Sequence, residues 1–378
     1  MRSGLVKAHR YLALTVGIFF VFLGLTGSIL AFYPELDRAL NPKLDIPHSE
    51  KRQSLETVLG NAKKVFPDKF LHSIFWASED QPFHQVWFTP SGDDQSLMWE
   101  VMVHPSTAEV IGHRQAVPTY DFTRTNFVNT IYTLHLLMFV GPLSFIFLGV
   151  CGFLVVLTLA IGVWLWWPTP KSLLLSLTIK RGASSFRRAF DLHRVLGIYS
   201  LIFLFIVSVT GIYLALPVQI ESLLGVNNET SMASVEVSPT NVEGHDLDTL
   251  LSHASTLVNA QHKLKSVWMP SETSSYWRVT FRDPVHIGYA GSDVIFLFDA
   301  QTGALLKSSN YETDSGIKQA LRWQHPLHSG RAFGFWGRAA VFVSGFVPLV
   351  LLITGFFIWR RKRIVLKKGP IKRLGRAH

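Results

Sequence analysis

The sequence HRYLALTVGIFFVFLGLTGSILAFYP, residues 9–34, determines the class of this chain, because it recurs in altered form as HRVLGIYSLIFLFIVSVTGIYLALP at residues 193–217. Both copies begin with His-Arg, and both place Thr-Gly seventeen residues after the histidine. Each copy contains an apolar run of about 20 residues, the length of helix that crosses the hydrocarbon core of a bilayer. The shared spacing predicts an internal duplication.

The composition of the chain is that of an integral membrane protein. Of its 378 residues, 48% are hydrophobic and only 16% are charged. Apolar runs long enough to span a bilayer occur at 11–33, 143–167, 195–216 and 339–359. The first run is longer than the apolar core of a secretory signal peptide and lacks a small-residue cleavage site, so we expect it to be retained.

The second and fourth apolar runs also match each other. Leu-His at 134–135 recurs at 327–328, an offset of 193, and the same offset relates Gly162 to Gly355. The sequence therefore predicts two copies of a unit made of a helix, an outside domain and a second helix.

The formal net charge of +10 is unevenly distributed. The two long connections, 34–143 and 217–331, are acidic, with thirteen Asp and Glu against nine Lys and Arg in the first and twelve against eight in the second. The basic residues gather in the N-terminal tail, in the short connection 168–190 and in the tail after the fourth run. Because positive segments stay in the cytoplasm, we expect both termini and the short connection to be cytoplasmic, the two acidic domains to lie outside, and no nucleic-acid partner.

The single cysteine, Cys151, lies within the second apolar run. The outside domains therefore contain no disulfide bond, and thiolate metal sites and cysteine-based redox chemistry are excluded. No HExxH, CxxC or GxGxxG motif occurs. The sequence thus offers no evident zinc, nicotinamide or flavin site.

Each outside domain begins with an amphipathic helical pattern. These patterns are SLETVLGNAKKVF from residue 54 and DLDTLLSHASTLV from residue 246, which open with a Ser and an Asp cap. Segments typical of strands follow, HQVWF and LMWEVMV in the first domain and YWRVTF and VIFLF in the second, and each domain ends in a turn and one further strand. One helix packed on a small antiparallel sheet is the expected unit.

Several motifs together resemble one known family over nearly the whole chain. They are the duplicated HR(Y/V)L start, the Leu-His pair before the second and fourth runs, the GVWLWWP exit and the helix-plus-sheet outside domains. The chain resembles the PepSY-associated transmembrane family, and within it is most similar to the FoxB-type inner-membrane ferric-siderophore reductases. The resemblance implies an α-helical membrane protein with α+β extramembrane domains, in which a four-helix transmembrane bundle is built from two repeats, each with a PepSY-like periplasmic domain. It also implies two b-type haems per chain.

The predicted boundaries follow the apolar runs. A continuous helix from His135 to Trp167 would be about 48 Å long, which exceeds the hydrocarbon core, so Pro142 is expected to end a separate interfacial helix. The expected segments are transmembrane helix 1 at 1–33, a PepSY-like domain at 34–126, the interfacial segment and transmembrane helix 2 at 127–167, a cytoplasmic loop at 168–190, transmembrane helix 3 at 191–216, a second PepSY-like domain at 217–325, transmembrane helix 4 at 326–360 and a basic tail at 361–378.

Four histidines lie at the ends of the apolar runs, His9 and His193 at the cytoplasmic side and His135 and His328 at the periplasmic side. Ionisable residues at such positions are costly to bury and are functional candidates. Two neutral imidazoles that face each other across a helical bundle form a common axial ligand set for haem iron. Two pairs predict two haems, which would carry electrons across the bilayer. An interfacial or capping role for each histidine is the alternative.

Other residues near these histidines have two possible roles each. His325 is the second choice as a periplasmic ligand, because Pro326 disfavours a regular helix there. Arg10 and Arg194 either pair with haem propionates or mark the cytoplasmic boundary. Gly162 and Gly355 either leave room for a macrocycle or permit close helix packing.

Two classes of function fit these features. The first is a haem-dependent ferric-siderophore reductase. An unknown donor, either a quinol or a cytoplasmic flavoprotein, would supply electrons to the haems. The periplasmic haem would pass these electrons to a ferric siderophore, and the reduced complex would release its iron. The second is a non-enzymatic PepSY-type regulatory or binding membrane protein, which explains the outside domains but leaves the paired histidines without a role. A transporter is disfavoured, because the repeats are parallel and no span is broken at mid-membrane.

Overall fold

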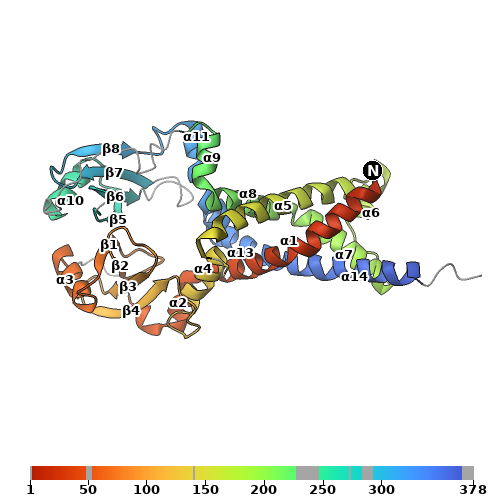
Figure 1. Cartoon of the computed structure of the whole chain (residues 1–378), viewed down its shortest axis with the longest axis horizontal. Helices are drawn as coiled ribbons and strands as arrows, with labels where there is room; N and C mark the ends of the chain where they lie inside the picture. Colours follow the sequence, from red (N-terminus) through yellow and green to blue (C-terminus); the bar gives the residue numbers. More distant parts are fainter. Residues whose placement is uncertain are drawn as a thin grey trace, which may run out of the picture. The chain divides into compact units, whose positions relative to one another are not determined.

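The computed structural model describes residues 2–47, 53–138, 141–226, 247–271, 274–282 and 293–367. The chain divides into two compact units (Figure 1). Met1–Ser28, Ile146–Ala215 and Ala339–His378 make up a helical unit, and Ile29–Phe145 and Leu216–Arg338 make up a sheet unit. Both units thus draw on segments from the two halves of the sequence.

Long apolar helices form the helical unit. Three helices are long and apolar enough to cross a membrane, Arg2–Leu30, Ser144–Trp166 and Arg331–Ile364, and a bent pair counts as a fourth if it is one span. The helices that contribute to this unit are α1 (Arg2–Leu30), α5 (Ser144–Trp166), α6 (Leu173–Ser176) after the short 3-10 turn η3 (Pro170–Ser172), α7 (Ser185–Tyr199), α8 (Leu201–Ala215), α13 (Gly334–Ser344) and α14 (Val347–Lys367).

The third apolar run is bent rather than straight. Helices α7 and α8 meet at 59° on either side of Ser200. The Ser200 hydroxyl donates a hydrogen bond to the carbonyl of Leu196 at 2.7 Å, one turn earlier. A serine that bonds back to its own helix in this way favours a local bend.

Small residues bring α1 close to the junction of α13 and α14. A Cβ atom on Gly24 would collide with the carbonyl oxygen of Gly345, and one on Gly345 would collide with the Ser28 hydroxyl. That hydroxyl donates to the carbonyl of Phe342 at 2.8 Å. The missing side chains therefore allow backbone contact between the first and last helices, as is common in membrane helix packing.

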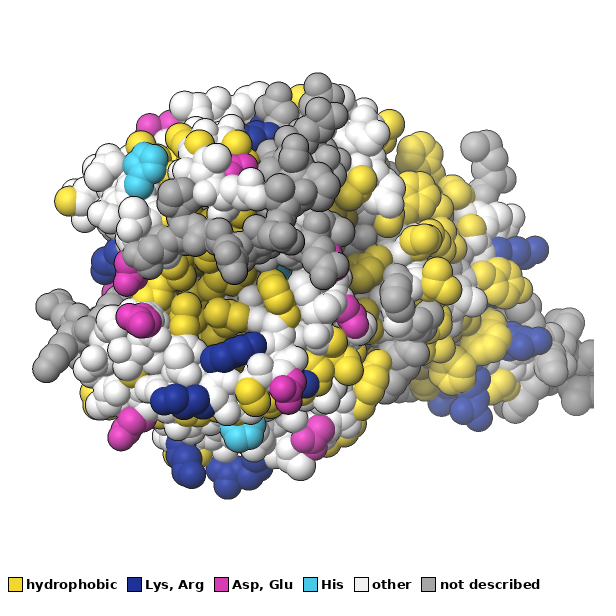
Figure 2. All heavy atoms as spheres, turned by 60° about the vertical axis from the view of Figure 1, so that its left-hand side comes forward, with side chains coloured by type: hydrophobic (Ala, Val, Ile, Leu, Met, Phe, Trp, Pro, Cys, Tyr) yellow, Lys and Arg dark blue, Asp and Glu magenta, His cyan; other side chains and the backbone are white. Residues whose placement is uncertain are grey.

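The surface of the helical unit is apolar along its length and basic at one end. Figure 2 shows hydrophobic side chains over these helices. Lys and Arg side chains gather at the end of the helical unit that lies on the right of this view. The N-terminus, α6, α7 and the end of α14 lie at this same end (Figure 1). This distribution is typical of helices that lie in lipid with one basic flank in water.

One antiparallel sheet of eight strands forms the centre of the sheet unit, in the order β4-β3-β2-β1-β5-β6-β7-β8. The strands are β1 (Phe70–Phe75), β2 (His84–Thr89), β3 (Met98–Val103), β4 (Val110–Val117), β5 (Lys263–Trp268), β6 (Tyr276–Arg282), β7 (Asp293–Asp299) and β8 (Leu305–Ser309). The helices of this unit are α2 (Tyr33–Leu40), η1 (Pro42–Leu44), α3 (Leu55–Val65), α4 (Phe127–Leu137), η2 (Gly141–Leu143), α9 (Pro217–Leu223), α10 (Leu247–Thr256), α11 (Gly316–Arg322), α12 (Gln324–Ser329) and η5 (Arg331–Phe333).

Helices α3 and α10 cover one face of the sheet. Val58 of α3 and Leu250 of α10 are buried in the same hydrophobic core as Ile74, Val267 and other inward residues of the central strands. The Ser54 hydroxyl caps α3 by accepting from the Thr57 backbone N–H at 3.3 Å, as its sequence predicts. The cap expected for α10, at residue 246, lies outside the described residues.

The two central strands, β1 and β5, were not expected from the sequence. They pair antiparallel with each other, with Ser73 opposite Trp268 and Phe75 opposite Ser266. The three strands expected for each outside domain are present, but within the described residues each domain contributes a fourth, and the eight strands join into one sheet. Each central strand has an irregular register with its neighbour, between Leu71 and Ser73 in β1 and after Leu264 in β5. Such bulges interrupt the two-residue alternation by which strands are recognised.

A buried ionic network fixes the connections that lead to the membrane helices. Arg114 of β4 donates to both carboxylate oxygens of Asp37 on α2, at 2.9 and 2.8 Å, and to Glu100 at 2.9 Å. It also donates to the carbonyl of Thr125 at 2.7 Å, just before α4. Burial opposes the charge of Arg114, but Glu100 and Asp37 outweigh it and raise its pKa. The network therefore holds α2 and the start of α4 against the sheet.

Candidate functional site

His9 and His193 lie next to each other in the helical unit, with the edge of one ring toward the face of the other. His9 belongs to α1 and His193 to α7, and their ring centroids are 6.4 Å apart with ring planes at 87°. They are separated by 184 positions in the sequence, so only the fold brings them together. The sequence prediction of this pair therefore corresponds to a contact between the two halves of the chain.

Hydrogen bonds fix the orientation of both rings. His9 Nδ1 lies 3.1 Å from the carbonyl oxygen of Thr158, which can only accept, so Nδ1 carries the proton. His193 Nδ1 lies 2.9 Å from Thr354 Oγ1, and that hydroxyl already donates to the carbonyl of Val350 at 2.7 Å. In the neutral form of both rings, Nε2 is then the nitrogen with a free lone pair. Metal-binding histidines commonly have this form, in which one nitrogen binds the metal and the other donates a hydrogen bond to the protein.

Glycines lie directly against these two rings. A Cβ atom on Gly162 would be 3.2 Å from His9 Cε1, and one on Gly355 would be 3.3 Å from His193 Cε1. Both distances are shorter than ordinary contacts between carbon atoms. The glycines therefore make room for the imidazole rings. This role is more specific than the two that the sequence suggested, which were close helix packing and room for a macrocycle.

Gly162→Ala tests this role. The added methyl group would push His9 out of line with His193, and we expect the variant to retain less than about half of the cofactor bound at this pair, since misplacing a metal ligand commonly weakens binding 10- to 100-fold. Cofactor content per mole of purified protein is the measurement. Gly4→Ala on α1 is the matched control, because nothing lies within 4 Å of a Cβ atom built there. Equal loss in both variants would contradict the assigned role.

His135 and His328 form a second pair, in the sheet unit. His135 belongs to α4 and His328 to α12, and their ring centroids are 6.2 Å apart at an angle of 57°. Helix α4 ends at Leu137, with Met138 in the left-handed conformation, and α5 begins at Ser144. The chain between them is thus not one continuous helix, and the histidine lies on a separate short segment.

Both separations match a metal held between two imidazoles. An imidazole nitrogen binds a metal at about 2.0 Å, and two such bonds in line place the ring centroids about 6.3 Å apart when the size of each ring is added. Ordinary edge contacts between aromatic rings cover the same range of centroid distances, so the distance alone does not identify a metal site. What distinguishes these two pairs is that each joins two histidines that match each other between the halves of the sequence. The residues of both pairs therefore fit the axial positions of a haem.

His325 lies in the same helix as His328. The sequence predicted an irregular segment here because of Pro326, and this prediction is wrong: α12 runs from Gln324 to Ser329. Proline is tolerated in the first turn of a helix, where its missing N–H has no partner to lose. Burial lowers the pKa of His325, and the charges of Arg331 and Lys265 lower it further. No ring contact joins it to His135 within the described part of the chain, so His328 is the better placed of the two.

The two arginines that follow His9 and His193 have different surroundings. Arg194 donates to the carbonyls of Leu175 and Thr178 at 3.0 Å each and forms an ion pair with Asp191 at 3.1 Å. The Nε atoms of both arginines are buried without a hydrogen-bond partner in the described structure, but the Arg10 guanidinium lies over the ring of Tyr11 at 4.8 Å and, among the described residues, makes no ion pair. Arg10 is therefore the more available of the two for an anionic group such as a propionate.

Asp191 is a site residue that the sequence analysis did not single out. It is fully buried two positions before His193 and binds Arg187 and Arg194, both at 3.1 Å. It also accepts from the backbone N–H of Lys180 at 3.3 Å. Asp191 thus ties the loop after α6 to α7 and holds the start of the helix that carries His193. A lone acidic residue in the basic segment RRAFDLHR was the available signal.

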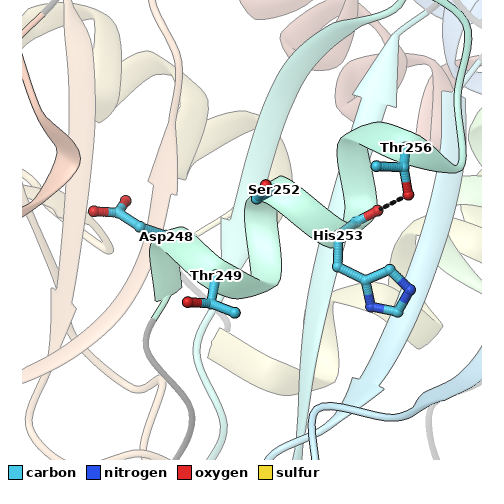
Figure 3. Close-up of a pocket in the computed structure, with 5 residues that line it drawn as sticks. All are labelled: Asp248, Thr249, Ser252, His253 and Thr256. Carbon is cyan, nitrogen blue, oxygen red and sulfur yellow. Dashed lines mark hydrogen bonds between the residues drawn. The ribbon is translucent and has the colours of Figure 1, made fainter.

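Other possible sites are less complete. Among the described residues, no group of three or more His, Cys, Asp or Glu could hold a metal ion. Figure 3 shows the residues that line a shallow pocket at α10, where the Thr256 hydroxyl donates to the carbonyl of His253. Its lining comes from this single helix, at Asp248, Thr249, Ser252, His253 and Thr256. A hollow with one wall cannot enclose a ligand, so it is not a candidate.

Apolar helices long enough to cross a membrane, together with an antiparallel sheet unit, define this chain as a membrane protein with a substantial extramembrane part. Residues 6–362 match the family described as the PepSY-associated TM region. The chain therefore belongs to the PepSY-associated transmembrane family. A search of curated proteins found no match.

Proposed function

We propose that this protein is a di-haem oxidoreductase of the bacterial inner membrane that passes electrons across the bilayer and reduces a ferric siderophore in the periplasm. The observation that carries the proposal is the pair of histidine contacts, with centroids 6.4 and 6.2 Å apart. A regulatory or binding protein would not require two such pairs. They provide four neutral ligands for two b-type haems.

Internal duplication supports this proposal. His9 lies against Gly162, and His193 lies against Gly355, so residues related by the sequence offsets of 184 and 193 make the same contact in each half. We infer that the membrane part is a four-helix bundle of two repeats, with the bent pair α7 and α8 as its third span. Both termini and the basic loop would then be cytoplasmic, and the sheet unit periplasmic.

The chain's own residues would hold and orient the cofactor. Bis-imidazole haem supplies a one-electron couple when bound. Thr158 and Thr354 hold the Nδ1 atoms of His9 and His193 and thereby leave Nε2 of each ring as the nitrogen that would bind iron. Arg10 is placed to pair with a propionate. Rigid ligands of this kind limit structural change between redox states.

Iron release follows from the chemistry of the substrate. One electron converts Fe(III) in the siderophore to Fe(II), which hard oxygen ligands bind less tightly. The electron enters the chain from a quinol or a cytoplasmic flavoprotein, and the siderophore docks on the sheet unit. No residue of the chain needs to form a covalent intermediate.

A reduced-minus-oxidised absorption spectrum of the full-length protein, purified from cells supplied with haem, tests the proposal. We expect b-type bands that correspond to two haems per chain, and reoxidation of the dithionite-reduced protein by a ferric siderophore. A folded but colourless preparation would overturn the haem assignment and favour a regulatory or binding role. Coloured protein that no ferric chelate reoxidises would refute the reductase assignment alone.

A further inference from the structure

The face of the sheet opposite to α3 and α10 carries an aromatic cluster at its centre. The ring of Phe75 on β1 lies 6.5 Å from Trp87 on β2 and 6.1 Å from Trp268 on β5, measured between centroids. All three side chains are partly exposed. The two four-stranded halves of the sheet meet at β1 and β5, and β2 lies next to β1.

Three cations surround a single carboxylate beside this cluster. Lys265 and Arg282 both form ion pairs with Asp293, the latter at 3.8 Å. The guanidinium of Arg278 lies over the ring of Trp268 at 5.7 Å. Arg282 has a further interaction of its own, so among the described residues Asp293 is the carboxylate set against Lys265 and Arg278, which leaves one positive charge in excess.

Polar donors in this region lack acceptors. Arg278 Nε and Trp87 Nε1 are buried without a hydrogen-bond partner in the part of the chain that the structure describes. Burial lowers the pKa of both Lys265 and Arg278, and Asp293 offsets this only in part. Buried donors and unpaired cations are costly unless an acceptor occupies the site. The Lys265 side chain is 30% exposed, so a ligand from solution can reach it.

This surface is connected through α11 to the helix of the second histidine pair. Arg322, the last residue of α11, donates to the carbonyl of Asp293 at 2.7 Å, and α12 begins two residues later. His325 lies on α12 together with His328. A ligand on the cationic surface would therefore bind near the histidine pair from which electrons would leave.

We propose that the surface formed by Phe75, Trp87, Trp268, Lys265 and Arg278 binds the siderophore and selects anionic ferric complexes, such as those of carboxylate and α-hydroxycarboxylate chelators, over neutral or cationic tris-hydroxamate complexes. The inference rests on the proposed reductase function. The aromatic rings contact the apolar backbone of the chelator, while the cations and the free N–H groups bind its carboxylate oxygens.

Binding of gallium complexes tests the inference without any redox step, because Ga(III) has the charge of Fe(III) but is not reduced. The full chain in nanodiscs would be titrated calorimetrically with the Ga(III) complex of a citrate-type siderophore and with that of a linear tris-hydroxamate. We expect the anionic complex to bind more tightly, and Lys265→Gln and Arg278→Gln each to weaken it by about tenfold or more. Lys263→Gln is the matched control, since Lys263 is exposed on the same strand.

Charge-conserving variants separate binding from folding. Lys265→Arg and Arg278→Lys should retain most of the preference, whereas the glutamine variants should lose it with an unchanged melting temperature. Equal affinity for the two complexes, or unchanged affinity in the glutamine variants, would overturn the inference. A shifted haem potential with unchanged binding would also overturn it, by showing that the cations serve the haem.

The same measurements keep this inference distinct from the proposed function. Reduced protein that is reoxidised equally well by anionic and cationic ferric complexes would refute the docking surface and leave the reductase intact. Selective binding of the anionic gallium complex by a protein that no ferric complex reoxidises would refute the reductase and leave the binding surface.

Discussion

His193→Ala is expected to remove about half of the haem from the purified protein and to leave the spectrum of the remaining half unchanged. The ring centroids of His193 and His9 are 6.4 Å apart, and the hydrogen bonds of their Nδ1 atoms to Thr354 and Thr158 leave Nε2 of each ring available to bind a metal. Removal of one imidazole leaves a single axial ligand, which does not hold a low-spin b-type haem firmly. His9→Ala should give the same result, since the two rings serve one site.

The measurement is haem content by the pyridine haemochrome method, together with the reduced-minus-oxidised spectrum. His262→Ala, at an exposed loop position of the sheet unit, is the control and should retain both haems. Combining His193→Ala with His328→Ala should give colourless protein, because the two pairs are independent sites. If His193→Ala alone removed all haem, or none, the assignment of two separate bis-histidine sites would be wrong.

The histidine pairs could be predicted from the sequence because duplication leaves a strong signal. Some residues recur at a fixed offset, at the same end of an apolar run. Such residues occupy equivalent places in two related units, and related units pack against each other across a common axis. His9 with His193 and His135 with His328 follow this rule. The hydrogen bonds that orient the first pair could not be predicted, because Thr158 and Thr354 are ordinary polar residues within apolar helices.

The single sheet was harder to predict than the helices. The strands FLHSIF and KLKSVW lack a clean alternation, because a bulge in each shifts the register by one residue. These two strands are far apart in the sequence, although Ser73 lies opposite Trp268 in the sheet. No turn connects them, and no regular spacing in the sequence indicates that they pair. The outer strands were recognisable because local alternation alone marks them. Similarly, the bend at Ser200 is associated with a hydrogen bond from the Ser200 hydroxyl to the carbonyl of Leu196, which an apolar run does not reveal.

Pro326 illustrates a different kind of error. A proline within the interior of a helix disfavours the helical conformation of the residue before it. Pro326 lies instead in the first turn of α12, where this rule does not apply. The helix places His325 and His328 about one turn apart, on neighbouring positions of its surface. Sequence alone therefore left two candidates for one ligand, and the contact with His135 favours His328.

His328→Ala and His325→Ala form a matched pair of variants that decides between these two histidines. We expect His328→Ala to lose the second haem and to slow reoxidation of the dithionite-reduced protein by a ferric siderophore by more than about 100-fold, because loss of a ligand exceeds the 10- to 100-fold effect of losing a residue that only supports one. The first haem should remain reducible, so the spectrum would show an intact but isolated centre.

His325→Ala should keep both haems and most of the reoxidation rate. The neutral His325 imidazole lies near Arg331 and Lys265, so its replacement changes the environment of these cations without removing a ligand. Stopped-flow absorbance at the b-type bands measures the reoxidation rate of each variant, and haem content measures occupancy. If the His325 variant instead lost the haem and the His328 variant kept it, the ligand assignment would be reversed. If both variants kept two haems and full rates, the second pair would be structural, and electrons would have to leave the protein by another route.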